Sequence, residues 1–252
     1  RAWRFAHVER ADDGAAQGRG RGAAWRGPAR SAWRGPARSS WSSSTDRAGY
    51  VAAVEATREA IREGEVFQAN VCRVLSAPLA PVPHPDGTPR EPSAAALAAR
   101  LATGNPAPYA GFVHVPRGGP VPGTWVVSAS PELFLRLEAD RITSAPIKGT
   151  AREPEGLTEK DRAENVMITD LVRNDLQRVC APGTVEVTEL LALERHPGLV
   201  HLVSTVSGVL DPAVAASPER WARLLGASFP PGSVSGAPKS SALEVIARLE
   251  PV

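Results

Sequence analysis

Residues 132–147, ELFLRLEADRITSAPI, decide the fold class of this chain. Apolar and polar side chains alternate through both halves of the stretch, as they do in β-strands that bury one face. The two halves meet at Asp140, which predicts an antiparallel hairpin. Strand-like runs also occur at 109–115 and 124–130. We therefore expect an antiparallel meander that ends in this hairpin.

Helices and further strands surround the predicted meander. Apolar residues at helical spacing, with capping and stop signals at the ends, predict helices, and alternation predicts strands. The predicted helices cover 46–63, 93–103, 158–178, 217–225 and a segment that begins at Pro238, and the predicted strands cover 65–75, 184–193 and 199–210. Because long strands and helices are segregated along the chain, the expected fold class is α+β.

Length and composition exclude several classes of protein. The chain has 252 residues, 42% of them hydrophobic, which is enough for the core of one large domain or two small ones. No run approaches the roughly 20 apolar residues of a membrane span, and no secretory signal opens the chain, so we expect a cytoplasmic protein without membrane contact. Cys72 and Cys180 cannot build a disulfide framework or a CxxC metal site. The chain begins at Arg1 and its one methionine is Met167, which indicates a fragment or a processed piece.

The N-terminal segment differs in composition from the rest. Residues 1–47 hold ten arginines and four acids, a net charge of +6 within a total of +2, and repeat WRGPARS at Trp25 and Trp33. Such low complexity predicts a flexible arm over 1–45, followed by a folded domain over 46–252. An Arg/Trp arm can bind nucleic acid through charge and stacking. A solvated linker is the commoner explanation, so we do not expect nucleic-acid binding.

Lys148 is the first candidate for chemistry. Lysine is scarce in this chain, three residues against twenty-six arginines, yet Lys148 lies in PIKGT where a predicted strand ends. Unlike arginine, a partly buried lysine can lose its proton and attack carbon. Glu132, sixteen residues earlier, could reach the same pocket wall, where an apolar environment raises a carboxyl pKa and suits a proton donor. A surface lysine and an exposed strand-end glutamate are the structural alternatives.

Other polar side chains interrupt apolar patterns. His201 lies within an apolar strand and suits acid/base or substrate-orienting work, although core histidines are commoner. Asp161 and Glu164 share one face of the 158–178 helix. Because magnesium usually takes one or two carboxylates plus water and substrate oxygens, Glu164 with Asp161 is a candidate Mg²⁺ site, or simply a solvated turn. The amides of Gln68 and Asn70 point at a polar group, although amides satisfied in the core are commoner.

Residues 230–239, PPGSVSGAPK, combine small residues, hydroxyls and a helix start. Free N–H groups and the helix dipole make such a segment suitable for a carboxylate or a phosphate. The candidate residues are Ser233, Gly236 and Lys239; Lys239 is either a charge partner or solvated. The spacing does not match the GxxxxGK[ST] pattern of a P-loop.

In this order, the motifs resemble the chorismate-utilising enzymes, the family of component I of anthranilate synthase and of aminodeoxychorismate synthase. The resemblance runs from about Asp46 to Glu250. It rests on GEVFQANVCR, SASPELFLR, APIKGTAR, DRAENVMITDLVRNDLQRVC, HLVSTVSGVL and FPPGSVSGAPKSSALEVIARLEP. The implied fold is two stacked antiparallel sheets in two related subdomains, flanked by helices, with the active site between them and the C-terminal part missing.

The resemblance also implies an activity. Aminodeoxychorismate synthases carry lysine in PIKGT, where anthranilate synthases usually carry alanine, so Lys148 favours amination of chorismate at C4 towards 4-aminobenzoate and folate. Lys148 would attack C2, Glu132 would help the C4 hydroxyl leave, and His201 would lie beside the ring. Glu164 would ligate the Mg²⁺ that holds the C1 carboxylate. The expected substrate contacts are Gly149, Thr150, Ser233, Gly236, Lys239 and Gln68.

Several consequences and alternatives follow. Gln68 occupies the position where isochorismate and salicylate synthases place a water-activating lysine, which disfavours water as the nucleophile. Neither cysteine lies in a G-x-C-x-G elbow, so ammonia should come from solution or from a separate glutamine amidotransferase subunit. Because the family's final magnesium-binding glutamate lies beyond this sequence, we expect the fragment itself to be inactive. The alternatives are anthranilate synthase component I and a truncated, non-catalytic domain whose arm binds nucleic acid. A pyridoxal-type lysine enzyme lacks the expected phosphate-site context.

Overall fold

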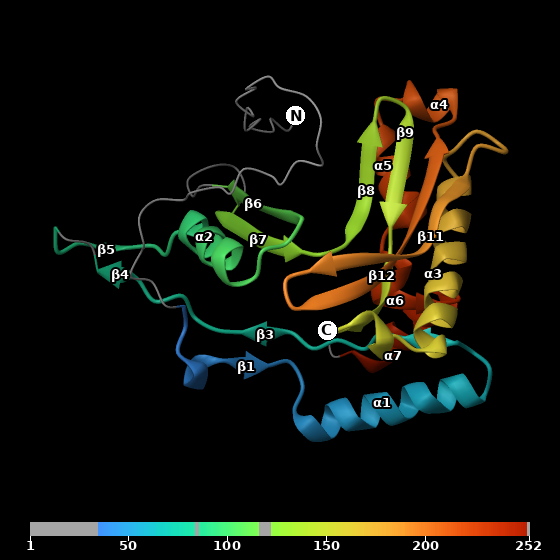
Figure 1. Cartoon of the computed structure of the whole chain (residues 1–252). Helices are drawn as coiled ribbons and strands as arrows, with labels where there is room; N and C mark the ends of the chain where they lie inside the picture. Colours follow the sequence, from blue (N-terminus) through green and yellow to red (C-terminus); the bar gives the residue numbers. More distant parts are fainter. Residues whose placement is uncertain (1–34, 84–85, 116–121, 251–252) are drawn as a thin grey trace.

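The structure is a computed structural model that describes residues 35–83, 86–115 and 122–250. A five-stranded antiparallel sheet forms its larger part (Figure 1). Its central strand is β12, which pairs with β11 along one edge and with β9 and β10 along the other, while β8 pairs with β9. The strands are β8 (Leu133–Glu138), β9 (Arg141–Ala145), β10 (Ile147–Ala151), β11 (Glu186–His196) and β12 (Leu199–Val209). The α+β class is confirmed.

The predicted hairpin is confirmed as β8 and β9, which turn at Ala139 and Asp140. The strand expected to continue to Ile147 divides at Pro146, which has no N–H to donate to the ladder. The division creates β10, whose Thr150 lies opposite His201 of β12. Pro146 therefore determines where β10, the strand that carries Lys148 and Thr150, begins.

The expected meander is wrong at one connection. Strands β6 (Tyr109–Val115) and β7 (Thr124–Ser130) form a separate two-stranded sheet, against which α2 (Ala94–Gly104) packs (Figure 1). No pairing joins β7 to β8. The alternation within each strand predicted the strands correctly, but it carries no information about which strands pair.

The single strand predicted over 65–75 is also wrong. Only β2 (Gln68–Ala69) and β3 (Leu75–Ser76) form, and they pair with different partners, β13 (Gly236–Ala237) and β1 (Ser42–Ser43). Both faces of the stretch mix apolar and polar groups, and Phe67 is 72% exposed. Without one buried face, nothing holds the stretch as one continuous strand.

Part of the predicted arm is described. Residues 1–34 lie outside the described residues, so the division of the chain at residue 45 stays a prediction. Within 35–45, η1 (Arg38–Ser40) and β1 form, and β1 pairs with β3. We expected regular structure to begin at Asp46, but it begins earlier in the chain. Two short paired strands, β4 (Val82–Pro83) and β5 (Pro89–Arg90), lie in the proline-rich connection that follows.

The predicted helices form, with shifts at some ends. Asp46 caps α1, and the capping box of Thr158 and Asp161 that opens α3 is confirmed. The helix expected from Ser217 begins after Glu219 instead, and Pro238 is the N-cap of the last helix rather than part of its first turn. The helices outside the β6–β7 unit are α1 (Arg47–Arg62), η2 (Pro154–Gly156), α3 (Glu159–Gln177), α4 (Pro212–Ala215), α5 (Arg220–Ser228), α6 (Gly232–Ser235) and α7 (Lys239–Leu249).

The main core lies between the large sheet and the helices α3 and α5. Its fully buried side chains include Ile142, Ile168, Leu176, Val206 and Leu224. Burial removes each of these large apolar side chains from water, which stabilises the fold by about 1.5–3 kcal/mol per side chain. The apolar stripe of α3 therefore fixes that helix against β12, while α1 and α7 share a smaller cluster.

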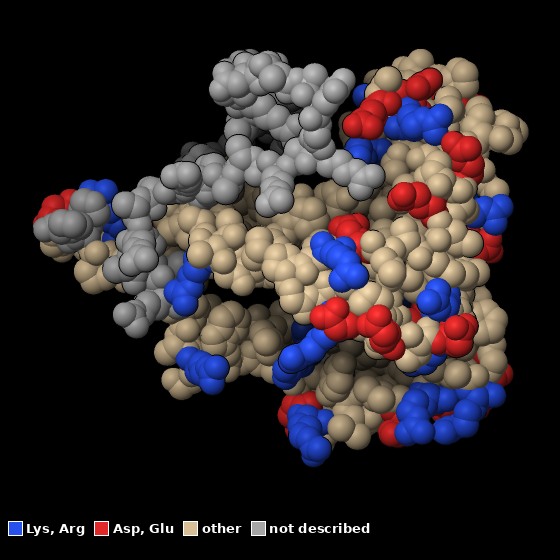
Figure 2. Space-filling model, in the orientation of Figure 1, with Lys and Arg blue, Asp and Glu red and all other residues tan. Residues whose placement is uncertain are grey.

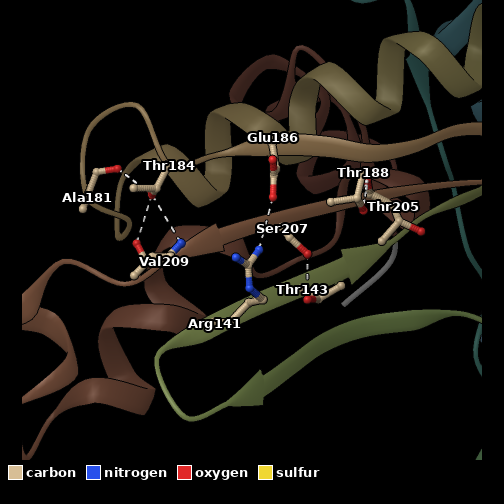
Figure 3. Close-up of polar contacts among 9 residues, drawn as sticks. All are labelled: Arg141, Thr143, Ala181, Thr184, Glu186, Thr188, Thr205, Ser207 and Val209. Atoms are coloured by element: carbon tan, nitrogen blue, oxygen red, sulfur yellow. Dashed lines mark hydrogen bonds and ion pairs between the residues drawn. The ribbon is translucent and has the colours of Figure 1, made fainter.

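Side-chain hydrogen bonds fix the end of β12 that is remote from His201. The hydroxyls of Thr143 and Ser207 lie 2.9 Å apart across β9 and β12, and the Thr184 hydroxyl lies 2.7 Å from the carbonyl oxygen of Ala181, as Figure 3 shows. Arg141 reaches Glu186 of β11 at 3.3 Å. These contacts hold the register of three strands.

Charged side chains are interspersed on the face drawn in Figure 2, where acidic and basic groups alternate over the helices. Many pair within one helix, such as Arg58 with Glu55 and Arg173 with Asp170. Exposed pairs of this kind contribute about 1 kcal/mol or less. Among the helices of the described residues, none has both the length and the apolar composition needed to cross a bilayer.

Candidate active site

Three of the predicted site residues meet at one point between the sheet and α6. Nζ of half-buried Lys148 donates a hydrogen bond to the carbonyl oxygen of Ser233 at 3.0 Å. The hydroxyl of Ser233 in turn donates to Oε1 of Glu132. Lys148 comes from β10, Glu132 immediately precedes β8, and Ser233 comes from α6. The structure therefore brings the proposed nucleophile and the proposed acid to the same short segment.

Burial raises the pKa of Glu132. Hydrogen bonds from Ser233 and from the N–H of Ile147, and the charge of Lys148, act in the opposite direction, but loss of water is the largest effect. The backbone of Glu132 is held by Ser130, whose hydroxyl donates to the Glu132 carbonyl oxygen at 3.0 Å. This glutamate is therefore fixed in place and biased towards its protonated form, as a proton donor requires.

Asn70 belongs to the same cluster and was not among the predicted site residues. Its Nδ2 donates to the carbonyl oxygen of Ser233 at 3.1 Å, so this one oxygen accepts from both Asn70 and Lys148. The signal was present in the sequence, because an amide between apolar neighbours needs a polar partner. What the sequence did not reveal was that the partner lies 163 residues away.

Close packing positions Ser233. A Cβ added to the neighbouring Gly232 would lie 2.3 Å from Cδ2 of Leu171 on α3. Gly236 has φ of +149°, and a Cβ there would lie 2.2 Å from the carbonyl oxygen of Gln68. Gly236 therefore serves the close pairing of β13 with β2. The role of Gly236 is to hold the α6 segment, which carries Ser233, against the segments next to it.

A second pair of predicted residues meets across β10 and β12. Oγ1 of Thr150 lies 2.8 Å from Nδ1 of His201, whose side chain is buried. Burial lowers the pKa of His201, and the nearby His196 lowers it further, while Glu194 raises it. His201 is therefore biased towards the neutral imidazole, with one ring nitrogen facing a hydroxyl.

Gly149, between Lys148 and Thr150, is required by packing. It has φ of +89°, and a Cβ there would lie 2.8 Å from Cβ of Asp161 on α3. Asn165, another residue that the sequence analysis did not single out, ties α3 to the same strands: its Nδ2 donates to the carbonyl oxygen of Leu202 at 2.9 Å. The first turns of α3 therefore lie directly against the strand that carries Lys148.

The two candidate magnesium ligands differ in how far their carboxylates are already engaged by other groups of the protein. Oδ2 of Asp161 accepts from the Thr158 N–H and hydroxyl, which lowers the Asp161 pKa. Glu164 is one-third exposed and, within the residues that the structure describes, pairs with exposed Lys160 at 3.4 Å. Among the described residues, no three His, Cys, Asp or Glu side chains are grouped to hold a metal. A single accessible carboxylate such as Glu164 still fits Mg²⁺, which keeps water and substrate oxygens as its other ligands.

Lys239 is a charge partner, one of the two alternatives that the sequence left open, and its partner lies inside the fold. Its Nζ forms an ion pair with buried Asp175 of α3 and lies 3.2 Å from the carbonyl oxygen of Ser228. Burial raises the pKa of Asp175, and Lys239 opposes that change. Lys239 is thus neither solvated nor aimed at an open site. Its charge is used inside the fold, because a buried carboxylate requires a partner.

Gln68 keeps an unused donor. Its side-chain nitrogen is buried and has no hydrogen-bond partner within the described residues. Gln68 lies on β2, directly paired with the β13 segment that follows Ser233. Because an unpaired buried amide is costly, this nitrogen is suited to donate to a bound molecule. The substrate contact expected from the sequence stays a prediction.

Together these groups can perform a displacement. A lysine amine, a carboxyl biased towards protonation and a neutral imidazole lie on adjacent segments, and an accessible carboxylate lies on the helix packed against them. Fixed donors and acceptors of this kind accelerate reactions chiefly by orientation and by stabilising developing charge.

The sequence matches the family model of chorismate binding enzymes over residues 10–252. Among curated proteins, it is 39% identical over 220 residues to anthranilate synthase component 1 of Aeropyrum pernix, covering 82% of this chain and 45% of that protein. It is 42% identical over 164 residues to aminodeoxychorismate synthase component 1 of Salmonella typhimurium, covering 60% of this chain and 34% of that protein. The chain spans less than half the length of these relatives.

A solved structure shares the fold. Anthranilate synthase component I from Streptococcus pneumoniae TIGR4 matches with a TM-score of 0.65 and 28% identity, over 84% of this chain and 44% of that one. The family model spans nearly the whole sequence, from the segment expected as an arm to the last residue. The resemblance drawn from the motifs is thereby confirmed, and the chain belongs to the family of chorismate binding enzymes.

Proposed function

We propose that this protein aminates chorismate at C4, the activity of an aminodeoxychorismate synthase component I. The observation that carries the proposal is the Lys148–Ser233–Glu132 connection. An anthranilate synthase usually has alanine in place of this lysine and needs no amine there. In this chain the amine is half-buried, held by a backbone carbonyl and connected through one residue to a carboxyl with a raised pKa.

The proposed reaction balances as two allylic displacements. The Lys148 amine forms a bond to C2, the ring double bond shifts, and the C4 hydroxyl leaves as water with a proton from Glu132. Ammonia then forms a bond to C4, the ring double bond shifts back, and the bond between Lys148 and C2 breaks to release the free amine. The ammonium group formed at C4 returns a proton to Glu132. Each step needs a donor and an acceptor in fixed positions, which the shared contacts of Ser233 supply.

The remaining predicted residues have supporting roles in this proposal. His201, kept neutral and oriented by Thr150, lies beside the ring. The backbone of Gly149 and Thr150, together with Ser233 and the free Gln68 amide, contacts the substrate. Lys239 and Gly236 act at a distance, because their contacts hold the segment that carries Ser233.

Glu164, with Asp161 as a weaker candidate, would hold Mg²⁺. The ion, when bound, would neutralise the C1 carboxylate of the substrate. The position of Glu164 on the accessible part of α3, near the strand of Lys148, supports this role.

A glutamine amidotransferase subunit is the proposed source of ammonia. The names of the relatives call them component 1, which supports a two-component enzyme. Binding to a co-expressed amidotransferase, with glutamine replacing ammonium as the nitrogen source, is the expected result.

Anthranilate synthase component I is the second candidate. The relatives with this name match 81–83% of the chain, whereas the aminodeoxychorismate synthases match 60%. It would remove the pyruvyl group and release an ortho-aminated product, so the two candidates differ in what they release.

Product identification tests the proposal. We expect the complete protein to which this chain belongs, given chorismate, ammonium and magnesium, to form 4-amino-4-deoxychorismate, with 4-aminobenzoate appearing only after a lyase is added. Anthranilate formed without a lyase would establish the second candidate. Lys148→Ala should abolish turnover, whereas the control variant Arg58→Ala removes a cationic side chain that is 61% exposed on α1 and should leave it intact. Full activity of Lys148→Ala would rule out the covalent step.

A further inference from the structure

Two histidines lie against each other at the beginning of β12. The ring centroids of His196 and His201 are 4.8 Å apart, with an angle of 67° between the ring planes, so the contact is edge-to-face. His201 is 8% exposed, and the side chain of His196 is 15% exposed. His196 ends β11, and the short turn into β12 brings the two rings together. His196 has no place in the reaction proposed above.

The second neighbour of His196 is an acid. Nε2 of His196 lies 2.7 Å from Oε1 of Glu194, two residues earlier on β11. Glu194 is also the residue directly opposite His201 in the pairing of β11 with β12, and its side chain is 45% exposed. Four polar groups therefore contact one another in series: Glu194, His196, His201 and Thr150.

His196 and Glu194 are the charged groups that act on His201. From β10 it meets the neutral hydroxyl of Thr150, and from α3 the nearest polar side chain bonded to β12 is the neutral amide of Asn165. The two β11 residues act in opposite directions: His196 lowers the pKa of His201 and Glu194 raises it. A substitution of His196 or of Glu194 should therefore change the pKa of His201.

We propose that His196 is a positioning residue for His201: it holds the His201 ring edge-on and, with Glu194 as its partner, controls the protonation state that His201 takes in the site. This inference deepens the proposed function, since His201 lies beside the substrate ring there. A ring at position 196 that served packing alone would need no hydrogen-bonded carboxylate. The observed pair places a titratable imidazole and a carboxylate beside a buried imidazole.

Nuclear magnetic resonance of ¹⁵N-histidine-labelled protein tests this without any substrate. His196→Phe keeps an aromatic ring and removes the imidazole that lowers the pKa of His201, so the pKa of His201 should rise. Glu194→Gln removes the negative charge, so the pKa of His201 should fall. The matched controls are His114→Phe on β6 and Glu189→Gln on β11, both expected to leave the titration of His201 unchanged. Unchanged titration in both test variants, or shifts in the same direction, would overturn the proposal.

The pH dependence of turnover gives the second measurement. If neutral His201 is the working form, the acid limb of the kcat profile should move to higher pH in His196→Phe and to lower pH in Glu194→Gln. An acid limb that stays in place while the titration of His201 moves would overturn the role in the reaction. Failure of the proposed function would show as wild-type protein that does not turn over chorismate. The magnetic resonance titration needs no turnover, so it still decides whether the two histidine rings are coupled.

Discussion

The carbonyl oxygen of Ser233 accepts a hydrogen bond from Nζ of Lys148 at 3.0 Å, although the two residues are 85 positions apart in the sequence. The same serine uses its hydroxyl to contact Glu132. Because the contact to Lys148 is made by the backbone, a change of the Ser233 side chain leaves it in place. The two functions of this residue can therefore be separated by mutation.

Ser233→Ala should move the alkaline limb of the pH profile. The hydroxyl of Ser233 stabilises ionised Glu132, so its removal raises the pKa of Glu132 further. If protonated Glu132 is the acid, activity persists to higher pH in this variant. The matched control is Ser235→Ala, which removes a hydroxyl that bonds within α6 to the carbonyl oxygen of Pro231 at 2.9 Å. An alkaline limb that is unchanged in Ser233→Ala argues against Glu132 as the acid.

Glu132→Gln should change how stability depends on pH. The folded-state pKa of Glu132 is raised by burial, so the protonated form favours folding and that contribution is lost as pH rises through the folded pKa. The amide cannot ionise, and it should therefore raise the free energy of unfolding more near neutral pH than at acid pH. Urea denaturation at both pH values measures this, with exposed Glu138→Gln on β8 as control. An equal effect of Glu132→Gln at the two pH values would contradict the assigned burial effect.

Asp175→Asn should destabilise the protein strongly. It leaves Lys239 buried without its anionic partner, which costs about 3–5 kcal/mol in comparable cases. Asp170→Asn, one turn earlier on the same helix, breaks an exposed pair with Arg173 and should cost about 1 kcal/mol or less. Denaturant titration of the two variants gives the comparison. Similar small losses from both would show that Lys239 is solvated, as the sequence allowed.

Gly236→Ala should disrupt the β2–β13 contact. The added Cβ would lie 2.2 Å from a backbone oxygen of Gln68, and the φ of +149° is unfavourable for alanine, so we expect a loss of stability of about 1–3 kcal/mol or more. Gly226→Ala on α5 meets no atom within 4 Å and should stabilise by up to about 1 kcal/mol. Thermal unfolding of the two variants measures the difference. Equal melting temperatures would mean that the α6–β13 segment can move freely.

The family and many of the local elements could be read from the sequence. The capping box of Thr158 and Asp161 and the hairpin at Asp140 depend on contacts between near neighbours, so the residues themselves specify them. Lys148, Glu132 and Ser233 could be named as candidates because their motifs keep their order along the chain.

The pairing of distant segments was decided only in the tertiary structure. In the tertiary structure Lys239 points inward and pairs with Asp175, and Asn70 bonds to a partner 163 residues away. The 65–75 stretch is divided between two sheets. Periodicity and capping act over a few residues, whereas these contacts depend on which surfaces become buried against each other. A polar side chain takes whichever partner burial leaves within reach, and one-dimensional spacing does not contain that information.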